Sequence, residues 1–163
     1  RKVQVWGRNP EKAAALATQY QDRFETGVVT DLADDVSQAD IVSCATLSAE
    51  ALVKGNWLKP GAHLDLVGAF RPTMRECDSV AITRGKVYVD TYAGARGEAG
   101  DLLQAMDESD FTFDDVCADL ADLLRGKTPG RERGDEITVF KSVGASLEDL
   151  AAAIEVWQQH SGA

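Results

Sequence analysis

The sequence has few of the residues that mark a metal site, a disulfide-stabilised protein or a membrane protein. Its three cysteines, Cys44, Cys77 and Cys117, are widely spaced and odd in number. They show no zinc or redox spacing and indicate reduced thiols in a core. No apolar run approaches the ~20 residues that span a membrane, and no leader marks secretion. We therefore expect no metal, no membrane contact and a cytoplasmic location.

Positive charge is also scarce, since 17 Lys and Arg face 27 Asp and Glu, a net charge of −10. This balance argues against a nucleic-acid partner, because phosphate backbones select basic surfaces. It does not exclude an anionic cofactor, because backbone amides and a few arginines are enough to bind phosphates. The length of 163 residues and an apolar fraction of 44% are typical of one globular domain with a real core.

Short apolar segments alternate with segments of helical periodicity along the whole chain. This alternation predicts an α/β fold with a mainly parallel sheet covered on both faces. The expected strands are residues 3–6, 27–30, 40–45, 63–67, 80–82, 86–90 and 137–140. The expected helices are residues 10–20, a turn from 31, and residues 48–54, 98–106, 114–124 and 146–159.

A G-x-G-x-x-G turn, which follows the first strand of a dinucleotide-binding (Rossmann) sheet, does not occur. Residues 3–8 nevertheless look like the second strand of that fold, and the later strands follow in the expected order. We therefore expect residues 1–163 to be a partial NAD(P)-binding domain that lacks the first strand and its glycine-rich loop. The first strand is central in the usual strand order, so its loss would leave a gap in the sheet.

Small and hydroxylic residues follow four of the predicted strands. In open α/β sheets ligands bind just outside the carboxyl ends of the strands, and small residues let a cofactor approach the backbone closely. The same residues could instead form ordinary tight turns or pack under a helix. The candidate cofactor-binding residues are Gly7, Arg8, Asn9, Ser43, Cys44, Ala45, Thr46, Val67, Gly68, Ala69, Ser142, Val143 and Gly144.

Arg8 bears on which nicotinamide cofactor would bind. NAD-using proteins place Asp or Glu at the end of the second strand, against the ribose hydroxyls. Gly7 and Arg8 stand there instead, and an arginine offers planar donors to a 2′-phosphate. The prediction is NADPH, with NADH possible; the alternative is a surface arginine after a strand.

Other polar residues have structural interpretations. His63 lies alone in a buried strand and is predicted to be structural. Arg71, Arg75 and Glu76 follow the Gly68–Ala69 pair, and they form either a solvated loop edge or a set of charges that orient a substrate.

Three stretches together resemble the ornithine cyclodeaminase/mu-crystallin family of nicotinamide-dependent enzymes. They are SCATLSAEALVKGNWLKPGAHLDLVGAFRPTMRECD, VYVDTYAGARGEAGDL and EITVFKSVGASLEDLAAA. The resemblance implies a Rossmann domain joined to a dimerising substrate domain in a homodimer. This chain resembles the cofactor domain alone, and its last helix would begin the return to the substrate domain.

The resemblance also implies a reaction. In the family's cyclodeaminases an aspartate follows the Gly-Ala pair, and Phe70 stands at that position here. Phenylalanine cannot accept a proton, so the resemblance favours the ketimine reductase branch. The implied reaction is NADPH-dependent reduction of Δ1-pyrroline-2-carboxylate or Δ1-piperideine-2-carboxylate to L-proline or L-pipecolate. Phe70 and Arg71 would lie near the substrate, but no catalytic residue can be named.

Several alternatives stay open at this point. The chain could belong to an ornithine cyclodeaminase or an alanine dehydrogenase of the same family, or to a Rossmann dehydrogenase outside it. It could also belong to a ligand-binding protein without turnover, because mu-crystallin itself also serves as a binding and structural protein. The family binds the substrate carboxylate with basic residues of the other domain. We therefore expect this chain alone to be inactive.

Overall fold

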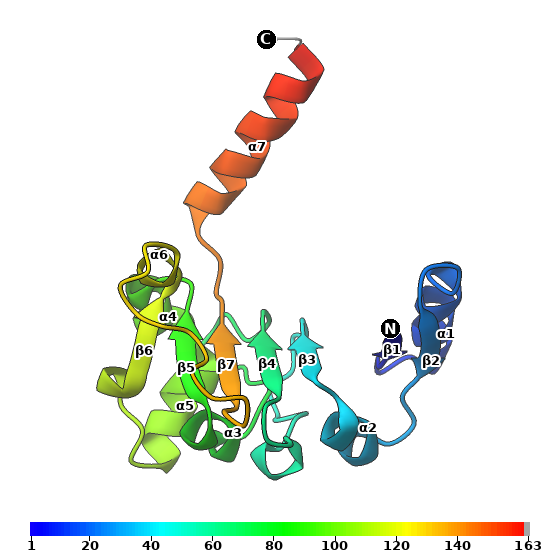
Figure 1. Cartoon of the computed structure of the whole chain (residues 1–163), viewed down its shortest axis with the longest axis horizontal. Helices are drawn as coiled ribbons and strands as arrows, with labels where there is room; N and C mark the ends of the chain where they lie inside the picture. Colours follow the sequence, from blue (N-terminus) through cyan, green and yellow to red (C-terminus); the bar gives the residue numbers. More distant parts are fainter. Residues whose placement is uncertain (162–163) are drawn as a thin grey trace.

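The computed structural model describes residues 1–161 and shows an α/β protein with parallel strands (Figure 1). The strands are β1 (Lys2–Val5), β2 (Glu25–Val28), β3 (Ile41–Cys44), β4 (His63–Leu66), β5 (Lys86–Val89), β6 (Val116–Asp119) and β7 (Thr138–Lys141). The helices are α1 (Pro10–Gln19), α2 (Leu32–Gln38), α3 (Ser79–Arg84), α4 (Tyr92–Glu98), α5 (Gly100–Glu108), α6 (Leu120–Leu124) and α7 (Ser146–Ser161), with short 3-10 helices at Gly55–Trp57 and Phe113–Asp115. None of these helices is long and apolar enough to cross a membrane.

Five strands form the main sheet in the order β3-β4-β7-β5-β6, and every neighbouring pair is parallel. The register places Cys44, Leu66, Lys141 and Val89 side by side, each at the last position of its strand. The carboxyl ends of these four strands therefore meet at one edge of the sheet, where α/β proteins bind ligands.

One face of this sheet carries the main core. Ile82 of α3 and Leu102 of α5 lie in the same hydrophobic cluster as the inward side chains of the central strands. Those side chains are Leu64, Leu66, Val87, Val89 and Val139, all at most 1% exposed. On the opposite face, His63, Asp65 and Phe140 are only half-buried. This face of β4 and β7 is therefore less completely covered than the face below α3 and α5.

The strands β1 and β2 pair with each other in parallel and form a separate small sheet. Asn9 caps α1, which packs on them through Ala13 and Ala17. Figure 1 shows this unit apart from the main sheet, with a space between β1 and β3. Ile41 of β3 is 68% exposed. The space lies between the second and fourth strands of a Rossmann sheet, where the sequence predicts a missing strand.

Hydrogen exchange should reveal the two open strand edges. An unpaired edge presents a row of free N–H and C=O groups, whereas β7 has a neighbour on each side. We expect alternate amides of β1 and β3 to exchange at near-unprotected rates while those of β7 are strongly protected. NMR-detected exchange on this chain measures both, and uniform protection along β3 would contradict the open edge.

Two predicted elements between the strands are wrong. Residues 48–54 form no helix, because the amides of Leu52 and Val53 donate to the carbonyl of Glu76, and Val53 bridges to Cys77. Residues 80–82, predicted as a strand, belong to α3. The side chain of Asp78 caps that helix by accepting from the amide of Ala81. In both places a cap or a distant carbonyl overrides the local pattern.

The predicted helix over residues 114–124 is also wrong. Val116–Asp119 pairs with β5 as strand β6, and Asp119 then caps the single turn of α6. The predicted helix over residues 98–106 corresponds to α5, preceded by the separate helix α4. The other predicted strands and the helices at residues 10–20 and 146–159 are confirmed to within about two residues.

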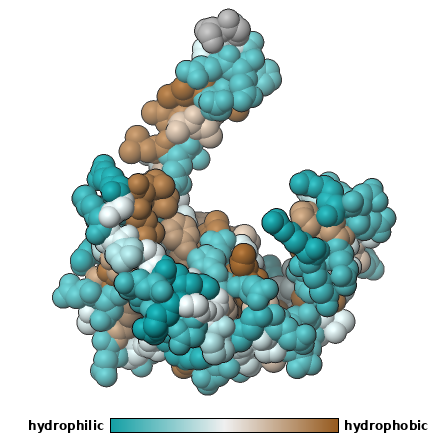
Figure 2. Space-filling view, viewed as in Figure 1, coloured by the Kyte–Doolittle hydropathy of each residue, from teal (hydrophilic) through white to brown (hydrophobic). Residues whose placement is uncertain are grey.

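The last helix, α7, extends away from the sheet (Figure 1). It has no buried residue, although it carries several large apolar side chains, which appear as brown patches in Figure 2. Leu147 and Trp157 are 75% and 71% exposed. Burying such side chains is worth about 1.5–3 kcal/mol each, so this helix carries an apolar surface that nothing covers in the described chain.

Candidate cofactor site

Three of the four predicted cofactor-binding stretches meet at the carboxyl edge of the main sheet. They are Ser43–Thr46 at the end of β3, Val67–Ala69 after β4 and Ser142–Gly144 after β7. The amide of Val67 donates to the carbonyl of Cys44 at 2.8 Å, and the amide of Ser142 donates to that of Leu66 at 3.0 Å. Three stretches distant in sequence thus form one continuous line of strand ends.

The fourth stretch, Gly7–Asn9, lies on the small sheet. Asn9 is used within that unit, where its side chain accepts from the amide of Lys12 at 3.0 Å. Arg8 is exposed. Within residues 1–161 no hydrogen bond or ion pair joins Arg8 to the other three stretches. The structure therefore leaves the Arg8 guanidinium available to a ligand, as the prediction of a 2′-phosphate contact requires.

The Gly68–Ala69 pair is buried and has a demanding conformation. A Cβ atom at Gly68 would lie 2.0 Å from the carbonyl oxygen of Thr46 and 2.5 Å from a carboxylate oxygen of Glu76. Ala69 has a φ of +50°, in the left-handed region that residues with a Cβ rarely adopt. Its carbonyl accepts from the amide of Gly100 at the start of α5. The loop is therefore held in one shape by close backbone contacts.

Phe70 and Arg71, predicted to lie near the substrate, project from the end of this loop. Both are exposed, and the guanidinium carbon of Arg71 lies 5.8 Å from the centroid of the Phe70 ring. No carboxylate stands at the position of Phe70. This loop tip offers an apolar ring and a cation, which suit an anionic substrate with an apolar ring but supply no proton acceptor.

The turn Ser142–Gly144 is held by Asp90, the residue after β5. One carboxylate oxygen of Asp90 accepts from the amides of Val143 and Gly144, both at 2.8 Å, and from the Ser142 hydroxyl at 3.1 Å. The other oxygen accepts from the amide of Thr91 at 2.6 Å. The two turn amides are thus used inside the protein. Contact of this turn with a nicotinamide stays a prediction and would involve its other groups.

A buried ion cluster lies beneath the same strand ends. The ammonium group of Lys141, fully buried, binds the carbonyl of Gly68 and lies 3.2 Å from a carboxylate oxygen of Asp101. The other oxygen of Asp101 accepts from the amides of Glu76 and Cys77. Glu76 is also fully buried and accepts from the amide of Thr46 at 2.5 Å. A solvated loop edge is therefore the wrong interpretation for Glu76.

The thiol of Cys44, at the end of β3, is not an activated nucleophile. Burial, with the nearby Glu76 and Asp101 carboxylates adding to it, raises the pKa of the Cys44 thiol to about 12. His63 lies at the first position of β4, at the opposite edge of the sheet from these strand ends. There burial lowers its pKa, and its ring bonds to the Thr138 hydroxyl at 2.8 Å. Cys44 therefore stays a neutral thiol near pH 7, and His63 has the structural role that its lone position in the strand predicts.

No group of three or more His, Cys, Asp and Glu side chains within residues 1–161 is placed to hold a metal ion. The donors at the strand ends are backbone groups, hydroxyls and one buried ion cluster. Ala45 and Gly144 at this edge are small and exposed. Contact of these residues with a nicotinamide stays a prediction.

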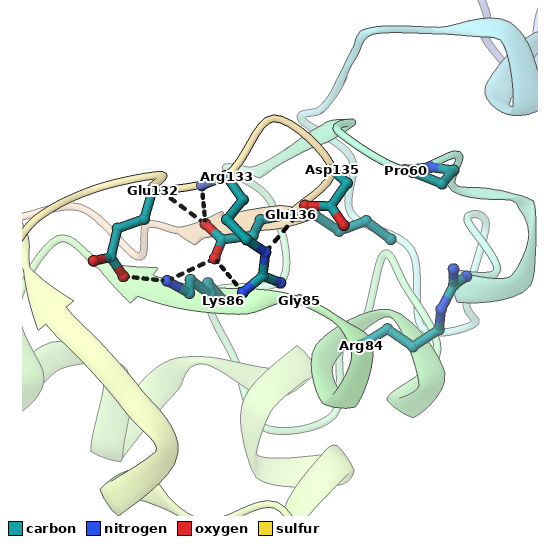
Figure 3. A pocket seen from close by; sticks show the side chains of 9 residues that line it. Pro60, Arg84, Gly85, Lys86, Glu132, Arg133, Asp135 and Glu136 are labelled. Carbon is teal, nitrogen blue, oxygen red and sulfur yellow. Dashed lines mark hydrogen bonds and ion pairs between the residues drawn. The ribbon is translucent and has the colours of Figure 1, made fainter.

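A cavity of about 610 Å³ lies at the opposite edge of the sheet (Figure 3). It is lined where β5 and β7 begin, at Gly85, Lys86 and Ile137. Its charged side chains pair with one another, since Lys86 lies 3.0 Å from Glu136 and 2.9 Å from Glu132. Parallel sheets bind ligands at the carboxyl ends of strands, so this cavity is not the predicted site.

Glu136 in that cavity predicts a specific acid response. Amides of Glu132 and Arg133 and the ammonium of Lys86 bind its carboxylate and lower its pKa from 4.5 to about 2. A depressed folded-state pKa adds stability above pH 4.5 and loses it as the pH falls toward 2. We expect the unfolding free energy of the protein minus that of Glu136→Gln to shrink between pH 4.5 and 2. Urea unfolding at several pH values measures it, and a constant difference would contradict the pairing.

Sequence reasoning missed the residues that hold the site together. Asp90 and Lys141 both follow apolar strand residues at the carboxyl edge, and a charge at that place is the signal that could have identified them. Asp101 carries no such signal, because it looks like an ordinary acidic residue in the first turn of a helix. Only the packing shows that its side chain is fully buried.

Comparison with known proteins agrees with this architecture. The chain is similar to the Δ1-pyrroline-2-carboxylate reductase of Colwellia psychrerythraea, with 38% identity over 161 residues that cover 96% of the chain and 50% of the relative. It is 34% identical to the ketimine reductase mu-crystallin of Mus musculus, covering 99% of the chain and 48% of the relative. The chain thus spans about half the length of the curated relatives that it matches.

A solved structure shows the same fold. The Δ1-pyrroline-2-carboxylate reductase of Thermococcus litoralis in complex with NADH and L-proline superposes with a TM-score of 0.92 at 32% identity, covering 99% of this chain and 51% of that one. The predicted α/β fold of the Rossmann type is confirmed. The family model for the ornithine cyclodeaminase/mu-crystallin family matches residues 1–163. This chain therefore belongs to the ornithine cyclodeaminase/mu-crystallin family.

Proposed function

We propose that this chain is the cofactor-binding half of an NADPH-dependent reductase of cyclic imino acids. The observation that carries the proposal is the loop Gly68–Phe70, held rigidly at the aligned strand ends with an aromatic ring where a cyclodeaminase needs a carboxylate. Similarity to reductases of Δ1-pyrroline-2-carboxylate supports the same reaction class. Δ1-Pyrroline-2-carboxylate and Δ1-piperideine-2-carboxylate are the proposed substrates, and L-proline and L-pipecolate the products.

The bound nicotinamide supplies a hydride to the C=N carbon, and a proton joins the ring nitrogen to complete the amine. The chain's own residues bind and orient. The strand-end loops present small residues and backbone groups to the cofactor, and Phe70 packs beside the substrate ring. Arg71 favours an anionic substrate near the loop tip by its charge. None of these residues is proposed to transfer the proton.

The cofactor preference rests on Arg8. Its exposed guanidinium follows the second strand of the fold, where an acidic residue would repel a 2′-phosphate. Arginine binds phosphate through paired, charge-assisted hydrogen bonds. NADPH is therefore the proposed cofactor, and NADH is expected to bind more weakly.

Kinetics of a full-length protein that carries this chain test both parts of the proposal. We expect it to oxidise NADPH with Δ1-pyrroline-2-carboxylate. Arg8→Asp should lower the ratio of kcat/KM for NADPH to that for NADH by about ten- to a hundredfold, the value of one or two charged hydrogen bonds. Arg23→Asp, another exposed arginine of the small sheet unit, is the control and should leave the ratio unchanged.

Other substrates separate the alternatives. Turnover of ornithine, or of pyruvate with ammonia, in place of the imines would assign the chain to a cyclodeaminase or an alanine dehydrogenase. Tight binding of a cyclic imine with no turnover would indicate a binding protein and overturn the reductase proposal. An unchanged cofactor ratio in Arg8→Asp would overturn only the assignment of NADPH.

The uncovered apolar surface of α7 supports a second domain and a homodimer in the whole protein. Trp157, 71% exposed in this chain, should be shielded from quenchers such as iodide in the full-length protein. Light scattering on that protein measures its mass, and a monomer would contradict the dimer. Three free thiols, Cys44, Cys77 and Cys117, fit a reducing compartment such as the cytoplasm.

A further inference from the structure

We propose that Lys141 is a positioning residue that sets the shape of the Gly68–Ala69 loop through a buried ion cluster with Asp101 and Glu76. The inference rests on the proposed function for its consequence, which is cofactor affinity. The structural claim is that the cluster connects three strand ends to α5 as a single unit, and it depends only on contacts within this chain.

The ammonium group of Lys141 is the centre of the cluster. It extends from the last position of β7 on the helix-covered face, between Leu66 of β4 and Val89 of β5. It binds the carbonyl of Gly68 and lies 3.4 Å from that of Leu66. A fully buried lysine is rare unless it is paired. Here two of its contacts are carbonyls of the very segment that leads into the loop.

Asp101 connects the cluster to helix α5. One of its oxygens lies 3.2 Å from the Lys141 nitrogen, and the other accepts from the amides of Glu76 and Cys77 at 2.6 and 3.0 Å. Asp101 follows Gly100, whose amide donates to the carbonyl of Ala69 at 3.1 Å. The first turn of α5 thus contacts the chain at two places, Ala69 in the loop and Glu76 further along.

Glu76 connects the cluster to the segment that follows β3. One of its oxygens accepts from the amide of Thr46 at 2.5 Å, and the other has no hydrogen-bond partner within residues 1–161. The same carboxylate fills the space beside the Cα of Gly68. Within residues 1–161 the ammonium of Lys141 forms an ion pair with Asp101 alone. Glu76 joins the cluster through its backbone amide, which donates to Asp101, and through its side chain beside Gly68. Loss of the ammonium would leave the Asp101 carboxylate without its cation, which buried sites tolerate poorly.

Native-state hydrogen exchange of the unmodified chain is the first test. The amides of Thr46, Glu76, Cys77 and Gly100 all donate to the cluster or to the loop that it holds. We expect them to exchange together, with one opening free energy and one denaturant dependence, as a single cooperative unit. Separate openings for Thr46 and for Gly100 would overturn the cluster as one device, whatever the function.

Variants of the full-length protein give the second test. Lys141→Met should lower Tm by about 10 °C, because it leaves the Asp101 carboxylate buried without a compensating cation. Adding Asp101→Asn removes the charge while keeping the acceptor for the Glu76 and Cys77 amides, so most of the Tm should return. NADPH affinity, measured by fluorescence titration, should stay about tenfold weaker in both variants, because the Gly68 carbonyl has lost its partner.

The control is Lys86→Met, which removes an ammonium at the opposite edge of the sheet. It should change Tm by only a few degrees, because the amides of Glu132 and Arg133 still bind the Glu136 carboxylate, and it should leave NADPH affinity unchanged, because Lys86 lies far from the strand ends that form the candidate site. A double variant that regains both Tm and NADPH affinity would overturn the positioning role. If the unmodified protein binds no NADPH, the proposed function fails instead. In that case the exchange rate of the Gly100 amide tests whether Lys141 positions the loop. A rate in the double variant equal to that in the unmodified protein would overturn the inference.

Discussion

Replacing Gly68 by alanine is expected to destabilise the protein by about 3 kcal/mol, at the upper end of overpacking costs. At this chain length the loss lowers Tm by about 6–12 °C. The added Cβ would lie 2.0 Å from the Thr46 carbonyl oxygen, a backbone atom that cannot move without shifting β3. The Gly68 carbonyl would also shift away from Lys141. Thermal and urea unfolding of this chain measure the effect.

Gly97→Ala provides the matched control. Gly97 lies in α4, and a Cβ there would meet no atom within 4 Å. Alanine should stabilise that helix by about 0.5–1 kcal/mol. A Gly68→Ala variant as stable as Gly97→Ala would show that the loop can relax, and it would remove the steric reason for glycine at the strand end.

Replacing Asp90 by alanine is expected to cost about 4 kcal/mol, because four partly buried donors lose their acceptor and a typical hydrogen bond contributes about 0.5–1.5 kcal/mol. Asp90 is 4% exposed, and its carboxylate accepts from the amides of Thr91, Val143 and Gly144 and from the Ser142 hydroxyl. Among these donors only the amide of Gly144 has a second acceptor within residues 1–161, the Ser142 hydroxyl at 3.3 Å. The turn that leads to α7 should lose its order, which NMR relaxation of the Gly144 amide measures.

Asp31→Ala is the comparison for that loss. Asp31 also accepts from two amides, those of Ala33 and Asp34, but at an exposed helix cap. Its removal should cost about 1 kcal/mol, since water replaces the carboxylate. Equal losses for Asp31→Ala and Asp90→Ala would mean that the Ser142–Gly144 turn finds other partners. The hydrogen bonds of Asp90 to this turn would then contribute little to the stability of the protein.

The pattern of the sequence predicted most of the scaffold but failed where a distant group decided the backbone. Residues 86–90 and 137–140 are rich in β-branched and aromatic residues, and they form strands as expected. Val116–Asp119 looks helical, yet pairing with β5 makes it a strand. Residues 48–54 lost their predicted helix to the carbonyl of Glu76. Local propensity is a weak prior beside such tertiary hydrogen bonds.

The candidate site shows the same division. The small residues that follow the strands were found by their spacing, and the structure brings three of the four stretches to one edge. The groups that shape this edge, Asp90, Asp101 and Lys141, are distant in sequence from the loops that they hold. Nothing local distinguishes a buried acidic residue from one in water, because burial depends on what the rest of the chain packs against it.

The sequence by itself determined the fold class, the family and the absence of a carboxylate at Phe70, because each follows from residue identity and order along the chain. The tertiary structure alone decided that Lys141, Asp101 and Glu76 meet below the Gly68 loop. It also decided that the Ser142–Gly144 amides belong to Asp90. Such contacts depend on strand order and register, and these arise only when elements distant in the chain pack together.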